Sequence, residues 1–459
     1  MVYKRLSAAI QSLYHKFGEP FGPIVLFGGN MKKLLLALSA LTIMAIGGDI
    51  EDAQNAIKAK EYDKALVLLK KAMREGNPRA SFLLGKLYLS GIGIDKEKEK
   101  DLLLSQQSSD PGDIDTRSFL GLLYFERKNY EKALYYFKGS AEQGNIISQV
   151  YLGELYQKGA GVQQDYKKAI ALYEKAIAQG SSYPEASIHA QNNLAGMYRD
   201  GQGVKKDLQK AIKLYKKGAK KGNATSQYCL GKMYDRGEGV KRDHKKAVAL
   251  YQKAAGQGLA EAQSMLGTLY ENGLEVKRDY AKALQWYQKA AQQGDAKGFN
   301  GLGTLCYTGK GVKQDYAKAA TYYTKAAAQG YARAQTNLGI LYYLGRGVKQ
   351  DYKKAAQWYQ KAAEQQEPQA QHNLGLMYGD GQGVARDDKK AAQLIRKAAE
   401  QGYTPSQLSV GILYYNGQGV KQNKLQAYRY WVMAAQEGDL SAQKNLDMLC
   451  LESPWICKQ

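Results

Sequence analysis

The sequence contains few of the residues that usually hold metals and disulfide frameworks. Its 459 residues include only four cysteines and four histidines. Four cysteines are few for a secreted scaffold held together by disulfides. His189, His244 and His372 fall far apart, and no group of histidine, cysteine and carboxylate residues has the spacing of metal ligands. We therefore expect no metal centre and no cofactor.

Acidic residues are also scarce relative to basic ones. The chain has 66 lysine and arginine residues against 43 aspartate and glutamate residues, which gives a formal net charge of +23. A positive surplus of this kind favours acidic partners.

Long hydrophobic runs are missing apart from one segment that follows Met31. Residues 31–48 combine the basic residues Lys32 and Lys33, an apolar run and the small residues Gly47 and Gly48, which is the pattern of a secretory signal peptide. A buried helix or a short membrane anchor is the alternative, but the run is short for a membrane span of about 20 residues. No cysteine follows the cleavage region, so no lipid anchor is expected there. The segment predicts a periplasmic or secreted protein with no stable membrane insertion after cleavage.

The predicted signal peptide also affects how the first residues are interpreted. Because such a peptide acts at the start of a chain, we expect Met31 to be the true start and residues 1–30 to lie upstream of it. Export would separate the protein from nucleic acid, which is therefore not an expected partner.

A unit of 36 residues recurs along most of the chain, and residues 334–366 are a representative copy. A fixed period of this length indicates a helical solenoid. In the first half of the unit, Ala334, Leu338, Leu341 and Tyr342 stand at i, i+4, i+7 and i+8, and the second half repeats this spacing. Each half is therefore predicted to be an amphipathic helix. The period is marked by Gly231, Gly267, Gly303, Gly339, Gly375 and Gly411.

Glycine and aspartate set the boundaries and contacts of the predicted hairpin. Gly339 lies inside the first helix, where glycine costs about 1 kcal/mol relative to alanine. Its recurrence predicts a close approach of two helices, with paired alanines such as Ala362 and Ala363 as the opposing surface. Gly345 is predicted to end the first helix in a left-handed conformation and Asp351 to cap the second.

Several motifs of this unit resemble a known family. The pieces Leu-Gly-x-x-Tyr, Gly-x-Gly-Val, Asp-Tyr-x-Lys-Ala and Lys-Ala-Ala-x-Gln-Gly, in this order, are similar to Sel-1-like repeats, which are relatives of the tetratricopeptide repeats. The resemblance covers roughly residues 79–447. It implies an all-α, right-handed α/α solenoid of about ten to eleven hairpins. It also implies a scaffold or adaptor for protein complexes, in bacteria often in the envelope.

The pattern divides the chain into a solenoid and its flanking segments. Residues 1–30 precede the expected start, residues 31–48 are the signal peptide, and residues 49–78 are a capping helix. The solenoid covers residues 79–440, and a capping helix with a tail covers residues 441–459. Asp447 replaces the marker glycine in the last copy, as a terminal cap with a polar face would require. Eleven first helices are predicted, at markers 85, 121, 153, 195, 231, 267, 303, 339, 375, 411 and 447.

The four cysteines and Ser441 have side chains that could form covalent bonds. Cys229 and Cys306 occupy helix positions and are predicted to be buried thiols. Cys450 and Cys457 are close in sequence, so an oxidising compartment would allow a disulfide between them, although spacing alone does not fix its geometry. Ser441 and Lys444 match the Ser-x-x-Lys pattern of penicillin-recognising enzymes, but the Ser-Asp-Asn and Lys-Thr-Gly partners are absent. A hydrolase that uses Ser441 is therefore only a remote alternative to a protein without catalytic activity.

Two rows of equivalent residues are candidate binding surfaces. The basic ridge follows the loop valines and consists of Lys205, Lys241, Arg242, Lys277, Arg278, Lys313, Lys349 and Lys421. It is either a solvated loop face or a site for an anionic envelope polymer. The amide row lies on the first helices and consists of Gln335, Asn337, Gln371, Asn373 and Gln407. It either binds an extended peptide on a concave face or forms hydrogen bonds within the repeats. We predict an exported, non-catalytic bacterial scaffold that binds protein partners, with polymer binding as the alternative.

Overall fold

The chain folds into a series of short α-helices. The computed structural model describes residues 49–57, 59, 61–74, 80, 83, 114–180 and 184–457, and no β-strand occurs in these ranges. Residues 49–57 are helical. The helices that follow are α3 (Tyr62–Arg74), α6 (Ile114–Glu126), α7 (Tyr130–Glu142), α8 (Ile146–Lys158), α9 (Tyr166–Ala178), α10 (Pro184–Asp200), α11 (Leu208–Lys220), α12 (Ala224–Arg236), α13 (His244–Gly256), α14 (Ala260–Asn272), α15 (Tyr280–Gln292), α16 (Ala296–Thr308), α17 (Tyr316–Ala328), α18 (Ala332–Leu344), α19 (Tyr352–Glu364), α20 (Pro368–Asp380), α21 (Asp388–Glu400), α22 (Thr404–Asn416), α23 (Lys424–Gln436), α24 (Leu440–Glu452) and α25 (Pro454–Cys457).

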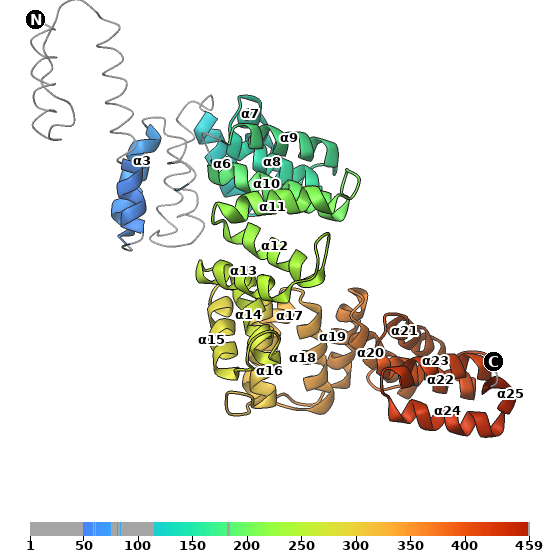
Figure 1. Cartoon of the computed structure of the whole chain (residues 1–459). Coiled ribbons are helices and arrows are strands. Elements are labelled where there is room, and N and C mark those ends of the chain that lie inside the picture. Colours follow the sequence, from blue (N-terminus) through green and yellow to red (C-terminus); the bar gives the residue numbers. More distant parts are fainter. Residues whose placement is uncertain are drawn as a thin grey trace, which may run out of the picture. The chain divides into compact units, whose positions relative to one another are not determined.

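These helices belong to two compact units, one up to Ala176 and one from Ile177 onward. In the second unit, each helix from α10 to α24 packs mainly on the helices before and after it in the sequence (Figure 1). Packing between sequence neighbours defines a solenoid, so the predicted all-α solenoid of helical hairpins is confirmed. Ten of the eleven predicted markers lie in described helices, and residue 85 lies outside the described residues.

The hairpin of α18 and α19 shows how local sequence specifies the fold. Gly345 ends α18 with a φ of 67°, a left-handed conformation that glycine adopts without a steric penalty. The backbone N–H of Lys354 donates a 2.9 Å hydrogen bond to Oδ1 of Asp351, which caps α19. Val348 packs against the buried cluster that contains Leu338 and Leu341. Both predicted caps are therefore confirmed.

The recurring glycine of the first helix lies against a large side chain of the second. A Cβ atom added to Gly339 would lie 2.6 Å from Cε1 of Tyr359. The same pairing joins Gly231 to Tyr251, Gly267 to Tyr287 and Gly303 to Tyr323. The predicted close approach is confirmed, but its predicted partner is wrong. The paired alanines Ala362 and Ala363 do not provide the nearest surface, because the atoms closest to Gly339 belong to the ring of Tyr359.

Most of the buried tyrosines in the second helices form hydrogen bonds inside the protein, although the buried hydroxyl of Tyr251 has no hydrogen-bond partner among the described residues. The hydroxyl of Tyr287 donates to Oε2 of Glu271 at 2.7 Å, and the hydroxyl of Tyr173 donates to Oε1 of Gln157 at 2.8 Å. Burial raises the pKa of the Tyr287 hydroxyl well above its ordinary value. The chain has 36 tyrosines against 8 phenylalanines, and internal hydrogen bonds of this kind favour tyrosine at such positions.

The two flanking regions are described only in part. The predicted signal peptide at 31–48, the preceding residues 1–30 and residues 84–113 of the predicted solenoid lie outside the described residues. The predicted capping segment at 49–78 contains two helical stretches, residues 49–57 and α3, whose residues Ala65, Leu69 and Ala72 are fully buried. At the other end, Asp447 is exposed as predicted, but α24 also exposes Leu440 and Leu451.

Candidate binding surfaces

The glutamines of the predicted amide row are buried, and Gln335 and Gln371 are hydrogen-bonded within the solenoid, whereas the buried Oε1 of Gln407 has no hydrogen-bond partner among the described residues. Gln335, Gln371 and Gln407 are each only 4% exposed. Nε2 of Gln335 donates to the carbonyl of Ala327 in the preceding hairpin at 3.3 Å. Oε1 of Gln335 accepts a 2.9 Å bond from Gln365, which ends the second helix of its own hairpin. The prediction that these three glutamines contact a partner is wrong, since buried side chains cannot reach one.

The same glutamine pairing recurs along the second unit. After four of the second helices, α13, α15, α19 and α21, a glutamine donates to the buried glutamine of the first helix in the same hairpin, at 2.8 to 2.9 Å, in the pairs Gln257–Gln227, Gln293–Gln263, Gln365–Gln335 and Gln401–Gln371. These bonds fix the register of the two helices in a hairpin. Because a buried amide without a partner would cost free energy, the pairing also explains why glutamine recurs at both positions.

The two asparagines of the amide row are half-buried. Nδ2 of Asn337 donates to Oδ1 of Asn300 at 3.0 Å, which joins equivalent surfaces of successive hairpins. The side chain of Asn373 shares a hydrogen bond with the hydroxyl of Tyr359. Both asparagines remain partly accessible, so they border the surface that the first helices expose.

The first helices expose an aliphatic row that the sequence analysis missed. Leu376 is 43% exposed, Ile412 is 39% exposed and Met448 is 60% exposed, and Ile340 at the equivalent position is half-buried. Each stands directly after the marker residue, so the four repeat at intervals of 36 residues. The earlier copies carry Lys232, Thr268 and Thr304 there. We call Ile340, Leu376, Ile412 and Met448 the aliphatic row, and its spacing was the signal that could have revealed it.

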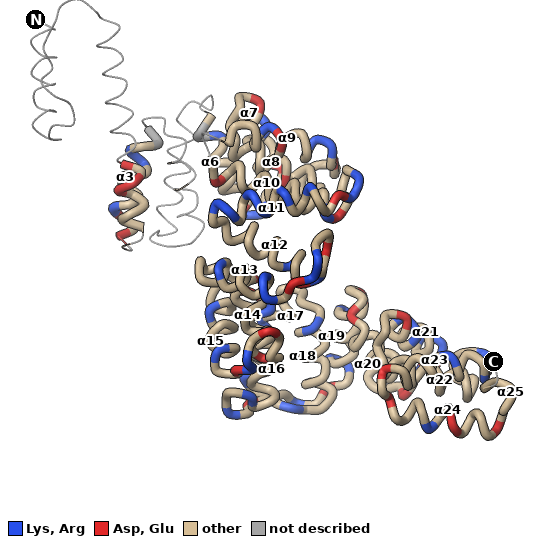
Figure 2. Tube along the Cα trace, in the orientation of Figure 1, with Lys and Arg blue, Asp and Glu red and all other residues tan. Residues whose placement is uncertain are grey.

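The basic ridge is exposed along its whole length. Its eight residues are all solvent-exposed, and none of them takes part in an ion pair with another described residue. Only Arg278 has a hydrogen bond, from Nη2 to the carbonyl of Asn272 at 3.2 Å. Figure 2 shows basic residues on helices and loops alike, including the loop between α12 and α13, where acidic residues stand beside them. The ridge is therefore available to an anionic ligand or to water.

Lysines in the second helices differ from those of the ridge because they have internal partners. Nζ of Lys354 lies 5.5 Å from the ring centroid of Tyr342 and 3.5 Å from the capping carboxylate of Asp351. Lys282 makes the same two contacts with Tyr270 and Asp279. These helical lysines contribute to packing as well as to charge.

A second cationic group lies on the first helices of the earlier copies. Lys232 is half-buried, and burial lowers its pKa, as do the nearby charges of Arg236 and Arg199. Arg199 is itself held by Asp200 through two hydrogen bonds of 2.7 Å. The first-helix face thus carries the cation Lys232 at α12 and an arginine–aspartate pair at α10, whereas it is aliphatic from α18 to α24.

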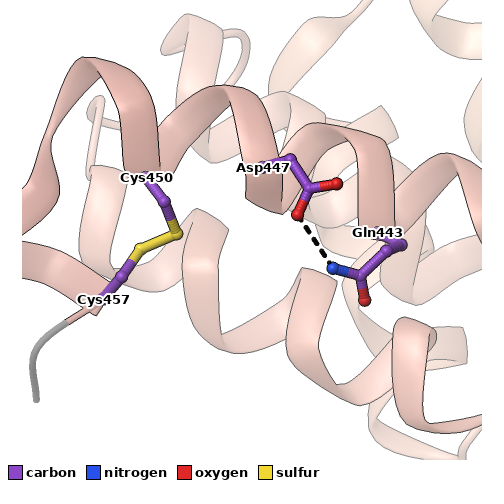
Figure 3. The surroundings of a disulfide bond; sticks show 4 residues. All are labelled: Gln443, Asp447, Cys450 and Cys457. Carbon is purple, nitrogen blue, oxygen red and sulfur yellow. Dashed lines mark hydrogen bonds between the residues drawn. A yellow bond between two sulfur atoms is a disulfide. The ribbon is translucent and has the colours of Figure 1, made fainter.

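The cysteines occupy two different environments. Cys306 is buried and Cys229 is half-buried, and burial raises the pKa of both thiols, so they are protonated at neutral pH. Cys450 and Cys457 form a disulfide with a Cα–Cα distance of 5.7 Å (Figure 3). The bridge joins α24 to α25.

The serine of the Ser-x-x-Lys pattern takes part in the capping of α24 through its backbone. Ser441 lies in the first turn of α24, and its backbone N–H donates to Oδ1 of the capping residue Asp439 at 2.8 Å. Of the histidines, His244 lies 2.7 Å from Asp235, and His372 is buried and lies 2.8 Å from the hydroxyl of Ser406. Burial lowers the pKa of His372 to about 4, so its imidazole is neutral at pH 7.

The described residues contain neither a metal site nor a helix that could span a membrane. Among them, no group of three or more histidine, cysteine, aspartate or glutamate side chains could hold a metal ion. None of the helices in the described ranges is both long enough and apolar enough to span a bilayer.

The fold and its surfaces define a class of protein, the α-solenoid built from helical hairpins of about 36 residues. The Sel1 repeat model matches ten segments, which together cover more than half of the chain: residues 78–100, 118–145, 146–181, 188–223, 224–259, 260–295, 300–331, 332–367, 368–403 and 404–439. The chain belongs to the Sel1 repeat family. Such proteins typically mediate interactions between proteins.

Similar proteins are known from bacteria and from mammals. The structure of c5321, a protective antigen of uropathogenic Escherichia coli, is 31% identical, with a TM-score of 0.53 over 93% of this chain and 91% of that one. A Sel1 repeat protein from Oxalobacter formigenes is 32% identical over 69% of this chain and 91% of that one, with a TM-score of 0.44. DAP3-binding cell death enhancer 1 of Rattus norvegicus is 34% identical over 93 residues, which are 20% of this chain and 18% of that protein. The match spans less than a fifth of that relative's length.

Proposed function

We propose that this chain is an exported bacterial scaffold without catalytic activity and that it binds a partner protein along the aliphatic row. The observation that carries the proposal is the exposure of Leu376, Ile412 and Met448 at equivalent positions of α20, α22 and α24. Single exposed leucines are common on protein surfaces, but exposed apolar residues that recur at one position of successive first helices indicate an interaction surface. Half-buried asparagines border this strip and supply polar contacts at its edge.

Export is supported by two features of the chain. Residues 31–48 carry the pattern of a signal peptide. The disulfide between Cys450 and Cys457 suits an oxidising compartment, where such bonds persist. The expected compartment is the periplasm or the exterior of the cell.

The proposed partner contact is tested by photocrosslinking in intact cells. A benzophenone amino acid at Leu376 or Ile412 should yield one discrete crosslinked product, because the partner covers the row. The control position is Gln357, an exposed residue of α19, which should yield none. Equal crosslinking at Leu376 and Gln357 would contradict binding along the row.

Export is tested by amino-terminal sequencing of this chain after its purification from cells. The sequence should begin near Asp49, and a sequence that includes residues 1–30 would contradict export.

Binding of an anionic envelope polymer to the basic ridge is the second candidate function, favoured by the exposure and the missing ion pairs of all eight residues. Replacing Lys241, Arg242, Lys277 and Arg278 with glutamine should weaken binding of dextran sulfate, used as the probe. The affinity of the unaltered protein should fall steeply with salt, because exposed charges are screened over about 10 Å at roughly 0.1 M.

The matched control for the ridge removes the same charge elsewhere. Lys253, Lys289, Lys325 and Lys361 form a row in the second helices, and their replacement with glutamine should change the affinity much less. Equal losses in the two variants would mean that net charge alone attracts the polymer. A salt-independent affinity would leave the ridge as a solvated face.

A further inference from the structure

The outer face of α24 is chemically unlike that of the other first helices. Leu440 is 77% exposed and Leu451 is 83% exposed, and Trp455 of the following α25 is 59% exposed. In the described residues, α24 is followed only by the four-residue α25, which the disulfide ties to it (Figure 3). Leucines with this degree of exposure favour contact with another apolar surface.

These leucines belong to one stripe of the helix. Leu440, Lys444, Asp447 and Leu451 stand at i, i+4, i+7 and i+11 and therefore lie on one face. All four are exposed. Lys444 has no ion pair with another described residue, and Asp447 accepts a 3.0 Å hydrogen bond from Gln443. Along the helix the stripe reads apolar, cationic, anionic, apolar.

This order makes the stripe complementary to itself when two copies lie antiparallel. A twofold axis between residues 445 and 446 places Leu440 opposite Leu451 of a second copy and Lys444 opposite Asp447 of that copy. Each contact then occurs twice, as twofold symmetry requires. A parallel arrangement would instead place Lys444 against Lys444, so the charges select the antiparallel one.

We propose that the chain forms a homodimer through the outer face of α24, with the two helices antiparallel. The leucine pairs supply the apolar contact, and the lysine–aspartate pairs set the register. Because each side contributes little more than one helix, the interface is small and the dimer should dissociate on dilution. This inference goes beyond the proposed partner binding, since it concerns a different occupant and the stripe of α24 alone, which adjoins the aliphatic row at Met448, four residues after Lys444.

Sedimentation velocity of the purified protein over a wide range of concentrations tests the dimer. The mass of the unaltered protein should rise from that of one chain to that of two. Leu451→Asp should raise the dissociation constant at least about tenfold, because it places a charge opposite a leucine. Leu344→Asp, which changes an exposed leucine of α18, is the control and should leave the dimer intact. Circular dichroism should show that both variants fold. A protein that stays monomeric, or a dimer insensitive to Leu451→Asp, would overturn the proposal.

Charge reversal tests the antiparallel register itself. Lys444→Asp and Asp447→Lys should each weaken the dimer, since each places like charges opposite one another. A mixture of the two variants should form heterodimers, and the double variant should form homodimers again, because opposite charges then face each other. If the mixture and the double variant are no better than the single variants, the second copy does not occupy this face as proposed. A dimer that forms through another surface would not be weakened by any of these substitutions. The same insensitivity is expected if this face binds a different protein, and either result would contradict the proposal.

Discussion

Replacing Gly339 with leucine is expected to destabilise the hairpin of α18 and α19 and its neighbours. Even a Cβ atom at this position would lie 2.6 Å from the ring of Tyr359, so a leucine must displace the ring or separate the helices. Overpacking of this kind typically costs roughly 1 to 3 kcal/mol. In a solenoid the loss spreads, since each hairpin is stabilised by the interfaces with its neighbours. Urea unfolding should therefore begin at a lower concentration.

A matched pair of alanine variants separates close approach from helix propensity. Gly256, in the last turn of α13, has no atom within 4 Å of the position of an added Cβ. Gly256→Ala should stabilise the protein by about 0.5 to 1 kcal/mol, because alanine is a better helix former than glycine. Gly339→Ala should change stability in the opposite direction. Stabilisation by both variants would show that Gly339 is not needed for packing.

Replacing Gly347 with alanine is expected to destabilise the junction between successive hairpins. Gly347 has a φ of 69°, and an added Cβ would overlap the backbone carbonyl of Tyr316 at the start of α17. A backbone carbonyl cannot rotate away as a side chain can, so the two hairpins must separate. The left-handed conformation costs roughly 1 to 2 kcal/mol for alanine, and the overlap adds to this cost. Hydrogen exchange of the amides in α17 to α19 should show the loss locally.

The control for Gly347 has the same backbone strain without the overlap. Gly330 has a φ of 84° and no atom within 4 Å of an added Cβ, so Gly330→Ala should cost less than Gly347→Ala. The chain also contains a natural counterpart, because Glu275 stands at the position equivalent to Gly347 with a φ of 56°. Glu275→Gly should accordingly stabilise its loop. Equal losses in Gly330→Ala and Gly347→Ala would contradict the role of close approach.

The period, the helices and their ends could be predicted from the sequence because the interactions that fix them are local. Gly345 needs only its own φ to end α18, and Asp351 caps α19 by a bond to a residue three positions later. The close approach at Gly339 could also be predicted, since a glycine that recurs inside a helix is unfavourable without a packing reason. Its true partner, Tyr359, lies 20 residues away, and periodicity alone does not identify which side chain faces it.

What each surface residue does was decided only by the tertiary structure. Gln335 and Leu376 lie on equivalent kinds of helix, and the sequence favours the glutamine as the exposed residue. The structure buries Gln335 because it lies between the preceding hairpin and the end of its own second helix, each of which supplies one hydrogen bond, whereas Leu376 remains exposed. Exposure depends on where the next helix packs. The sequence alone determined the repeat, its helices and its loops, and the stacking of the repeats decided which residues a partner can reach.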